Sequence, residues 1–499
     1  MFVKVISGSY FGVDPFLVEV EVDTTNGLPI FIIVGLGDTI ISESKDRIRG
    51  AIKNSGYFME PKRIVVNLTP ANLRKNGSNF DLPIGIGVMV GMKFIKDYRD
   101  ILKRYMFIGE LSLTGEIRRT QGVISAVLLA KEMGFEGIVI PKSNYKEASI
   151  IKGIKIIPLE NLKEVVTFIE REEYPLVEIE EEKIKETFKI DYGDIHGQLL
   201  GKRALEICAA GGHNVILIGS PGSGKTMLSK GIMSILPPME EKEIIETTKI
   251  YSIAGELNED KNIINMRPFR SPHNSSTVSS IIGGGKNPRP GEISLATNGI
   301  LFMDEFTEFT RETIEALREP LEEKRISITR STGKVEFPAH FIFIAACNPC
   351  PCGYGFDEDR CICNNYDIRR YQKKISGPII DRIDLYVEVK RLTEEEMLND
   401  KIQESSDEVR ERVEKARSIQ RERYGIGKLN GDMDNKDIKI YCNLDLECQR
   451  IVKGAIKSLN LSMRSYNKIL KVARTIADLE GQKSITKENI LEAIAFRKK

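Results

Sequence analysis

The segment at residues 219–226 constrains the fold of this chain more than any other. Its members fit the phosphate-binding pattern G-x-x-x-x-G-K-[ST], and they are Gly219, Ser220, Pro221, Gly222, Ser223, Gly224, Lys225 and Thr226. The apolar run 214–218 predicts a strand before it, and the run 227–236 predicts a helix after it, which is the context that the pattern requires. Glycines let backbone N–H groups turn toward phosphate oxygens, and the helix adds its positive end. The sequence therefore predicts an ATP site in a P-loop fold.

Charged and hydroxyl side chains supply the rest of this predicted site. Lys225 should reach the β- and γ-phosphates, and the Thr226 hydroxyl should bind Mg²⁺. Asp304 and Glu305 follow the buried apolar run 299–303; Asp304 suits the Mg²⁺ shell, and Glu305 suits activation of the attacking water. Two acids after a strand also form ordinary solvated turns, but the upstream P-loop favours the catalytic interpretation.

A third predicted strand, at residues 341–346, is followed by Cys347 and Asn348. The Asn348 amide at this place can hydrogen-bond the attacking water or the γ-phosphate. An asparagine at a strand end is usually a turn former. Its position after the two strands already assigned is what favours a role in the site.

The pattern of apolar residues divides the 499 residues into parts and indicates the α/β class. Residues 1–172 predict a mixed α/β domain, and the glutamate-rich residues 173–190 predict an acidic linker. From 191 to 390, short apolar strands alternate with helices, which is typical of a parallel sheet wrapped by helices. Strand signals then disappear, so 391–499 predict an all-α C-terminal domain that begins with a charged helical run at 394–422.

Composition excludes some classes of protein. The net charge is +1, with 41% hydrophobic and 29% charged residues, as in ordinary soluble globular proteins. A polyanion partner would therefore have to be held by local basic patches. No stretch of about 18 apolar residues exists, and the N-terminus lacks the layout of a signal peptide. We expect no membrane partner and a cytoplasmic location, where thiols stay reduced.

Four cysteines lie close together in a cysteine-rich insert at 347–363. They are Cys350, Cys352, Cys361 and Cys363. Four thiolates match tetrahedral Zn²⁺ in number and type. Each pair has one intervening residue, fewer than the usual two to four, so reduced cysteines in a loop are the alternative interpretation. The other cysteines are predicted to be a strand residue (Cys347) and core residues (Cys208, Cys442 and Cys448).

Taken together, these motifs resemble the AAA+ class and, more closely, the magnesium-chelatase-like ATPases of the ComM (YifB) group. The resemblance covers essentially the whole chain. The stretches that carry it are RPFRSPH at 267–273, PRPGEISLA at 288–296, CNPCPCG at 347–353, ISGPIIDRID at 375–384 and ARTIADL at 473–479.

The resemblance implies a ring ATPase, here a homo-hexamer, whose sites are shared between neighbouring subunits. It implies that Asn348 is the first sensor and that Arg382 is an arginine finger, which stabilises charge on the phosphoryl group in the neighbour's site. It also implies that Arg464 is a second sensor, carried on a C-terminal helical lid. The residues alone would favour surface salt bridges for both arginines.

A predicted hairpin precedes the third strand. Residues 325–330 and 334–337 flank Ser331-Thr332-Gly333, a turn-forming sequence. In similar motors such hairpins point into the central pore. Arg330 and Lys334 near the turn can therefore hold DNA phosphates, a contact that is independent of base sequence. A basic hairpin turn is also an ordinary solvated turn.

The N-terminal domain resembles the Lon protease domain at residues 107–117. A Ser–Lys protease needs a hydroxyl beside an amine of lowered pKa. In our alignment Asn79 takes the place of the serine and Ile124 that of the lysine, with Ser78 one position away. The resemblance therefore implies a Lon-like domain without proteolytic chemistry.

The resulting functional hypothesis is an ATP-driven DNA motor. The resemblance implies a hexameric branch-migration helicase that promotes integration of DNA during homologous recombination or natural transformation, with single-stranded or branched DNA as the partner. Two alternatives are a Lon-type ATP-dependent protease and the motor subunit of a magnesium chelatase. The chelatase alternative does not explain the Lon-like domain.

Overall fold

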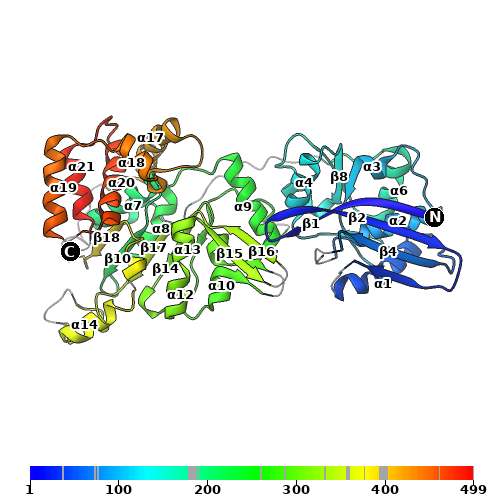
Figure 1. Cartoon of the computed structure of the whole chain (residues 1–499), viewed down its shortest axis with the longest axis horizontal. Helices are drawn as coiled ribbons and strands as arrows, with labels where there is room; N and C mark the ends of the chain where they lie inside the picture. Colours follow the sequence, from blue (N-terminus) through cyan, green and yellow to red (C-terminus); the bar gives the residue numbers. More distant parts are fainter. Residues whose placement is uncertain are drawn as a thin grey trace.

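The computed structural model describes residues 1–35, 39–71, 75, 78–177, 188, 190–258, 261–285, 288–330, 333–355, 360–375, 377–392, 403–459 and 461–497. Most of the predicted acidic linker, 173–190, lies outside these residues, as do Ser331 and Thr332 of the predicted hairpin turn. The molecule is elongated, with an N-terminal lobe and a larger C-terminal lobe (Figure 1). In the described part of the chain no helix is both long and apolar enough to cross a bilayer.

The described part of the N-terminal lobe combines three sheets with helices, as the mixed α/β prediction requires. Its strands are β1 (Phe2–Phe11), β2 (Asp14–Thr25), β3 (Phe31–Val34), β4 (Arg63–Thr69), β5 (Tyr105–Phe107), β6 (Glu110–Leu111), β7 (Ile117–Arg118), β8 (Gly137–Pro141) and β9 (Lys155–Leu159). Its helices are α1 (Thr39–Asn54), α2 (Asp81–Gly91), α3 (Ile101–Arg104), α4 (Val123–Glu132), η1 (Lys142–Asn144), α5 (Tyr145–Ala148) and α6 (Leu162–Arg171). The larger sheet has the order β1-β2-β4-β3, a smaller one has the order β5-β8-β9, and β6 pairs with β7 in a two-stranded sheet.

Helix α2 packs against the larger sheet. All of its residues are buried. Val18, Val20 and Val22 point to the same face of β2 and are fully buried, because side chains two apart in a strand share a face. A Cβ added to Gly87 of α2 would lie 2.5 Å from Val22 Cγ2, so the glycine allows the helix to approach the strand. This packing forms the core of the lobe.

The C-terminal lobe is built on a five-stranded sheet with the order β11-β14-β17-β10-β18, in which every neighbouring pair is parallel. Its strands and those of two hairpins are β10 (Val215–Gly219), β11 (Phe269–Arg270), β12 (Gly283–Gly284), β13 (Arg289–Pro290), β14 (Ile300–Met303), β15 (Arg325–Arg330), β16 (Gly333–Pro338), β17 (Ile342–Cys347) and β18 (Leu385–Val389). The helices that precede or connect these strands are η2 (Tyr192–Asp194), α7 (Leu199–Gly211), α8 (Lys225–Ile235), α9 (Glu241–Ala254), α10 (Val278–Ile282), α11 (Glu292–Leu295), η3 (Phe306–Glu308), α12 (Arg311–Ala316), α13 (Arg318–Glu323), α14 (Asn365–Gln372) and α15 (Gly377–Ile380). The predicted parallel α/β core is confirmed. The two-residue edge strand β11 was not predicted, because so short a strand carries no periodic signal.

Helices alone form the C-terminal end of the chain, as predicted. They are α17 (Ser406–Tyr424), η4 (Asn430–Asp432), α18 (Asn435–Tyr441), α19 (Leu446–Ser458), α20 (Met463–Leu479) and α21 (Lys487–Ala495). Of the predicted helical run at 394–422, residues 394–402 lie outside the described part of the chain, 403–405 are not helical, and the rest belongs to α17, which begins at Ser406. Ser405 starts it, because its hydroxyl accepts a hydrogen bond from the Glu408 N–H and so caps the helix.

These helices share a hydrophobic core with one face of the sheet, and buried polar groups join the two. Cys208, Cys442 and Cys448 are buried in this core, as predicted. His213, between α7 and β10, lies 2.7 Å from the Thr475 hydroxyl of α20. Lys468 of α20 forms an ion pair with Asp384, just before β18, at 2.8 Å. Removing the Asp384 carboxylate would take from the largely buried Lys468 amine the acid that it pairs with, which is costly for a buried charge.

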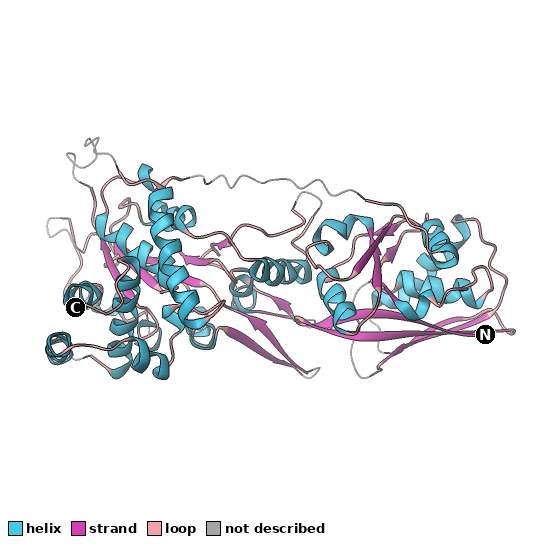
Figure 2. Cartoon of the chain, turned by 90° about the horizontal axis from the view of Figure 1, so that it is seen from above, coloured by secondary structure: helices cyan, strands magenta, loops and turns pink. Residues whose placement is uncertain are grey.

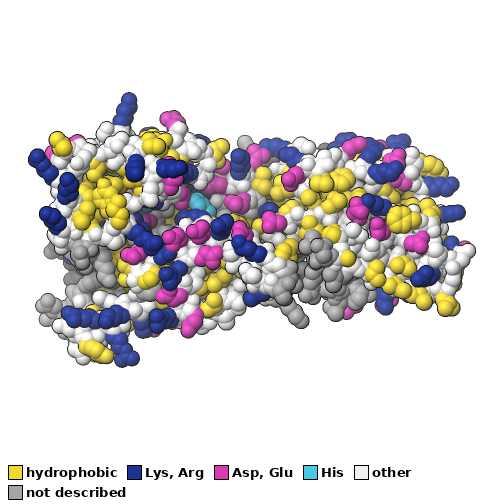
Figure 3. Space-filling view, viewed as in Figure 1, with side chains coloured by type: hydrophobic (Ala, Val, Ile, Leu, Met, Phe, Trp, Pro, Cys, Tyr) yellow, Lys and Arg dark blue, Asp and Glu magenta, His cyan; other side chains and the backbone are white. Residues whose placement is uncertain are grey.

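The surface carries both signs of charge, in keeping with the small net charge. On the face drawn in Figure 3, acidic and basic side chains are interspersed over both lobes. A row of basic side chains follows α14 at the lower left, where Arg369 and Arg370 lie on the helix and Lys373 and Lys374 directly follow it. This basic segment was not predicted as a functional one.

Candidate nucleotide-binding site

The predicted phosphate loop lies between the end of β10 and the start of α8. Gly222 and Gly224 have φ angles of 75° and 89°, a left-handed backbone that favours glycine, and a Cβ added to either would meet nothing within 4 Å. Gly219 must lack a side chain for another reason: a Cβ there would lie 2.3 Å from the carbonyl oxygen of Val389. The loop therefore presents an open cradle of backbone N–H groups at the positive end of α8.

The amine of Lys225 lies over this loop. It donates to the carbonyl oxygens of Gly219 (2.7 Å) and Ser220 (3.0 Å) and to Oδ1 of Asn348 (3.4 Å). Burial lowers the pKa of Lys225, and nearby Asp304 opposes that shift. Asn348 directly follows β17, the neighbour of β10, so the sheet order brings it beside the loop.

Asp304 and Glu305 follow β14 at the same edge of the sheet. The Thr226 hydroxyl donates to Oδ2 of Asp304 at 2.9 Å, so the two predicted Mg²⁺ ligands are in contact. Glu305 is exposed and has a φ angle of 48°, which is uncommon for a residue with a side chain. The side-chain amide of Asn274 donates to its carboxylate at 3.0 Å. The structure thus gathers the predicted cluster of Lys225, Thr226, Asp304, Glu305 and Asn348; the roles of these residues stay predictions.

Asn274 is a site residue that the sequence analysis missed. It follows directly on the RPFRSPH stretch at 267–273, which was noted for resemblance and not for chemistry. Its proximity to Glu305 depends on the pairing of β11 with β14, which places the segment after β11 beside the acidic end of β14. No local signal marked Asn274, because the two-residue strand β11 leaves no periodic pattern in the sequence.

Arg382 and Arg464 do not lie with this cluster. The Asn214 side chain, directly before β10, donates to the carbonyl oxygen of Arg382 at 3.3 Å. Arg382 also precedes β18, which runs parallel to β10. The phosphate loop follows the other end of β10, and a five-residue strand spans about 16 Å. Arg382 therefore lies at the opposite edge of the sheet from the phosphate loop of its own subunit.

Glu322 of α13 contacts both predicted arginines. It forms an ion pair with Arg382, and one with Arg464 at 3.6 Å. Both arginines line one cavity of about 680 Å³, together with Asp381 and Lys468, and no residue of the phosphate loop is among the described residues that line it. The structure thus places the predicted arginine finger and the predicted second sensor side by side. Sequence reasoning did not find Glu322, because nothing in a charged helix marks one glutamate among several.

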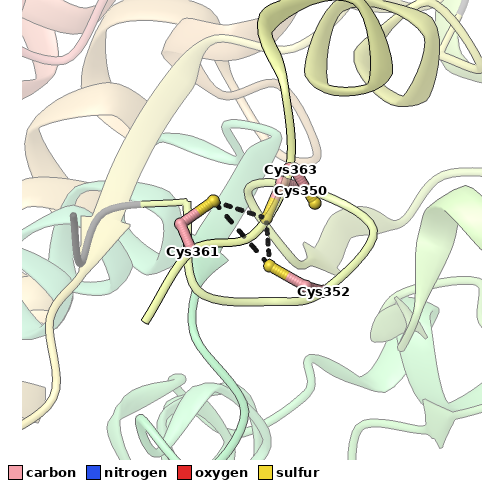
Figure 4. Close-up of side chains that lie close together, drawn as sticks. All are labelled: Cys350, Cys352, Cys361 and Cys363. Carbon is pink, nitrogen blue, oxygen red and sulfur yellow. Dashed lines mark hydrogen bonds between the residues drawn. The ribbon is translucent and has the colours of Figure 1, made fainter. Parts of the chain in front are cut away.

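The four predicted zinc ligands converge (Figure 4). The Sγ atoms of Cys350 and Cys352 are 3.3 Å apart, and Cys361 Sγ lies 3.9 Å and 3.8 Å from them. With Cys363, all four sulfur atoms lie within 4.8 Å of one another. Zn–S bonds of about 2.3 Å in a tetrahedron place the sulfurs about 3.8 Å apart, so this set fits a zinc ion. None of the chain's eight cysteines forms a disulfide.

The cysteine cluster also packs against the phosphate loop. A Cβ added to Gly353 would lie 2.8 Å from Cδ of Pro221. Cys350 is buried two residues after Asn348. Cys347 is the last residue of β17, as predicted. A metal held by these thiolates would therefore fix backbone that touches the nucleotide site.

The predicted hairpin is present as β15 and β16, with Arg330 paired to Gly333 in the register. Arg330 and Lys334 are exposed, and Lys334 forms an ion pair with Glu336 at 2.6 Å. A Cβ added to Gly284 of β12 would lie 3.4 Å from a terminal nitrogen of Arg330, so the shorter hairpin β12–β13 lies alongside. That hairpin contributes the exposed Arg289. Two neighbouring hairpins thus carry the basic side chains.

The N-terminal lobe shows how the residues compared with Lon are held. The side-chain amide of Asn79 donates to the carbonyl oxygen of Gln121 at 3.2 Å, and Ile124 is fully buried. The Ser78 hydroxyl donates to the carboxylate of Glu110. The Lys75 amine donates to backbone carbonyl oxygens, that of Gly35 at 3.1 Å and that of Pro70. The partners found for Ser78 and Lys75 are thus acceptors, and neither side chain is paired with the other.

Known protein families match the chain along most of its length. Family models described as "Magnesium chelatase, subunit ChlI", "Subunit ChlI of Mg-chelatase" and "Magnesium chelatase, subunit ChlI C-terminal" match residues 191–397, 20–144 and 403–497. The chain is 42% identical to the competence protein ComM of Haemophilus influenzae, over 99% of this chain and 97% of that protein. It is 39% identical to the uncharacterized protein YifB of Escherichia coli, over 97% of this chain and 95% of that protein.

Two partial matches accompany these full-length ones. The chain is 26% identical to the DNA replication licensing factor mcm6 of Dictyostelium discoideum, over 39% of this chain and 19% of that protein. It is 36% identical to the DNA repair protein RadA of Listeria monocytogenes, over 18% of this chain and 20% of that protein.

Proposed function

The chain belongs to the family of magnesium-chelatase-like AAA+ ATPases that includes ComM and YifB, and from this premise we propose that it is an ATP-driven motor that acts on DNA. The finer proposal is a homo-hexameric helicase that drives branch migration during recombination of incoming DNA. The observation that carries the DNA part is the pair of adjacent hairpins with exposed Arg330, Lys334 and Arg289. The partial matches to a replication factor and a DNA repair protein support the same class of substrate.

The proposed chemistry uses the cluster at the end of the sheet. Bound ATP would supply the phosphoryl group, and Mg²⁺ would neutralise charge on its oxygens. Lys225 and the loop backbone would bind the phosphates, while Thr226 and Asp304 would hold the metal. Glu305 would orient the attacking water and accept its proton, and Asn274 would hold the Glu305 carboxylate in place. Asn348 would hydrogen-bond the γ-phosphate or the water.

We propose that the site is completed by a second copy of the chain. Arg382 lies at the opposite edge of the sheet from its own phosphate loop, so it can meet phosphates only on a neighbouring subunit. Arg464 contacts the same Glu322 and would be offered to the neighbour together with Arg382. Such a head-to-tail contact generates a closed ring when the rotation closes. A ring of six copies is the form proposed.

The DNA part of the proposal is tested by ATPase rate with and without single-stranded, double-stranded and four-way DNA. We expect stimulation by DNA, and in the double variant Arg330→Ala/Lys334→Ala we expect about tenfold more DNA for half-maximal stimulation. The salt dependence of DNA binding should lose about two units of slope, because two phosphate contacts are removed. Arg325→Ala, at the base of the same hairpin, is the matched control. If none of the three DNAs raises the ATPase rate of the native protein, the proposal is contradicted.

We also propose that Zn²⁺ is a structural cofactor held by Cys350, Cys352, Cys361 and Cys363. The sulfur separations support this, and the reduced thiolates suit the cytoplasm, where the proposal places the protein. We expect about one zinc per purified chain and close to none in Cys352→Ser, with a lower unfolding temperature. Metal analysis and thermal unfolding measure this. Cys448→Ser, in the core and away from the cluster, should keep its zinc; metal-free native protein would contradict the proposal.

A second candidate function is the motor subunit of a magnesium chelatase, which the names of the matching family models favour. An ATPase stimulated by a chelatase partner and indifferent to DNA would support it. The protease alternative gains no support from the contacts of Ser78, Asn79 and Lys75. We therefore propose an N-terminal lobe of Lon-like fold without proteolytic chemistry.

A further inference from the structure

The turn between β1 and β2 belongs to the N-terminal lobe and contacts the C-terminal lobe. The two strands form the long ribbon that crosses between the lobes, and its turn meets β15 and β16 (Figures 1 and 2). Phe11 and Val13 are half-buried there, packed against the hydrophobic core that contains Ile328, Val335 and Phe337 of the hairpin. The basic hairpin is therefore covered on one side by a part of the chain that is more than 300 residues away in sequence.

The contact between this turn and the hairpin is close. Gly12 is buried and has a φ angle of 66°, and a Cβ added to it would lie 2.0 Å from Cγ1 of Val335. On the other side of the pair, a Cβ added to Gly333 would lie 3.1 Å from the ring of Phe11. Each of the two segments has a glycine at the contact. The position of β16 therefore depends on the turn that lies against it.

Tyr10 at the base of the turn contacts the N-terminal lobe, and through it the helix α9. A Cβ added to Gly122 would lie 2.2 Å from Cε1 of Tyr10, the residue before Phe11. The Gly122 N–H donates to the carbonyl oxygen (3.3 Å) and the hydroxyl (3.1 Å) of Ser252 on α9. The base of the turn therefore packs on a residue of the N-terminal lobe whose backbone is itself hydrogen-bonded to α9.

Charges around the turn connect it to the neighbouring hairpin and to α9. Burial raises the pKa of Tyr10, and Arg289 of β13 acts in the opposite sense, which places that cation near the phenol. Burial lowers the pKa of Lys249 on α9, and Asp14 at the start of β2 opposes the shift. The β1–β2 turn thus lies among all three elements that carry or support the basic side chains.

From these contacts we infer that the β1–β2 turn is a positioning element for the DNA-contacting hairpin. By packing on β16 it sets where Arg330 and Lys334 lie, and so it sets how strongly DNA stimulates the ATPase. The DNA part of this inference rests on the proposed function. The positioning itself does not: it concerns the order and place of β15 and β16 in the protein alone. Gly12 and Phe11 act through the hairpin, since neither belongs to the nucleotide cluster.

The central variant is Gly12→Ala, which inserts a methyl group where Val335 lies. We expect backbone amides of β15 and β16 to exchange hydrogen about tenfold faster, because the hairpin is pushed off its support. We also expect half-maximal stimulation to need about tenfold more DNA, while the ATPase rate without DNA stays within about twofold of native. Hydrogen exchange read by mass spectrometry and an ATPase titration with DNA measure the two effects.

Three further variants make the test specific. Gly134→Ala is the matched control: this glycine of the same lobe also has a positive φ, 78°, but a Cβ there would meet nothing within 4 Å. It should behave as native in both measurements. The double variant Gly12→Ala/Val335→Ala removes the two γ carbons of Val335, including Cγ1, which the new methyl group would meet most closely. It should recover most of the loss, compared with Val335→Ala alone. Phe11→Ala removes the contact without inserting an atom and should change both readouts in the same direction as Gly12→Ala.

The outcomes separate this inference from the proposed function. If Gly12→Ala matches Gly134→Ala in the exchange of β15 and β16, the turn does not position the hairpin, and the inference is overturned. If the native protein is not stimulated by any DNA while Gly12→Ala still loosens the hairpin, the proposed function fails and the positioning stands. If Gly12→Ala speeds exchange throughout the chain, Phe11→Ala decides, because it leaves the left-handed turn unchanged: faster exchange confined to β15 and β16 supports the inference, and native exchange there overturns it.

Discussion

Replacing Glu305 with glutamine is expected to lower the rate of ATP hydrolysis by about 100- to 1,000-fold while ATP and ADP still bind. Glutamine keeps the size of the side chain and can still meet Asn274, but it cannot accept a proton from the attacking water. The phosphate loop, Thr226 and Asp304 are left as they are, so the binding of nucleotide should stay within about threefold of native. Steady-state hydrolysis and equilibrium binding of a fluorescent ATP analogue measure the two effects separately.

Two comparisons make this expectation specific. Glu308→Gln changes an exposed carboxylate three residues further on, which pairs with Lys374 and is not part of the cluster, and it should hydrolyse ATP at the native rate. Lys225→Ala should lose nucleotide binding as well as turnover, because its amine lies over the phosphate loop. A Glu305→Gln protein that keeps more than about a tenth of the native rate would show that another group takes the proton.

The second large effect is expected for Arg382→Ala, which should lower hydrolysis by about 1,000-fold or more, equivalent to about 4 kcal/mol of transition-state stabilisation. The decisive result comes from mixing. Neither Arg382→Ala nor Glu305→Gln should hydrolyse ATP alone, yet rings assembled from equal amounts of both should regain about a quarter of the native sites. At those sites an intact Glu305 meets the intact Arg382 of a neighbour, as a head-to-tail contact requires.

The matched control for Arg382 is Arg318→Ala. The carbonyl oxygen of Arg318 accepts a hydrogen bond from Arg382, but its side chain pairs with Glu315, so this variant should stay close to native in rate. Mixtures that remain as inactive as their components, although they assemble, would mean that Arg382 does not serve the site of a neighbour. Arg464→Ala in the same mixing experiment tells whether the two arginines that share Glu322 act on the same nucleotide.

Local patterns in the sequence were sufficient for most of the nucleotide cluster. The phosphate loop, the acidic pair Asp304 and Glu305, and Asn348 each directly follow a strand that the apolar pattern revealed. Parallel strands end at the same edge of a sheet, so these residues had to come close once the strands were recognised. The cysteine cluster was predictable for a similar reason, because all four ligands lie within 14 residues of one another.

The remaining features depend on contacts between residues far apart in the chain. Asn274 reaches Glu305 only because β11 pairs with β14, and a two-residue strand leaves no trace in the sequence. Glu322 of α13 became important only when the fold brought Arg382, between α15 and β18, and Arg464 of α20 to the same carboxylate. The approach of Gly12 to Val335 is of the same kind.

By itself, then, the sequence determined which chemical groups are available: a phosphate loop, an acidic pair suited to hold a metal and accept a proton, a cluster of four cysteines and a basic hairpin. Those features are short in sequence, so the residue types and their spacing carry them directly. Only the tertiary structure decided how these groups lie relative to one another and to the two lobes. It put Arg382 at the far edge of the sheet from its own phosphate loop, and it seated the β1–β2 turn on the hairpin. The strand order and the packing between lobes set those distances, and neither is written in any local segment.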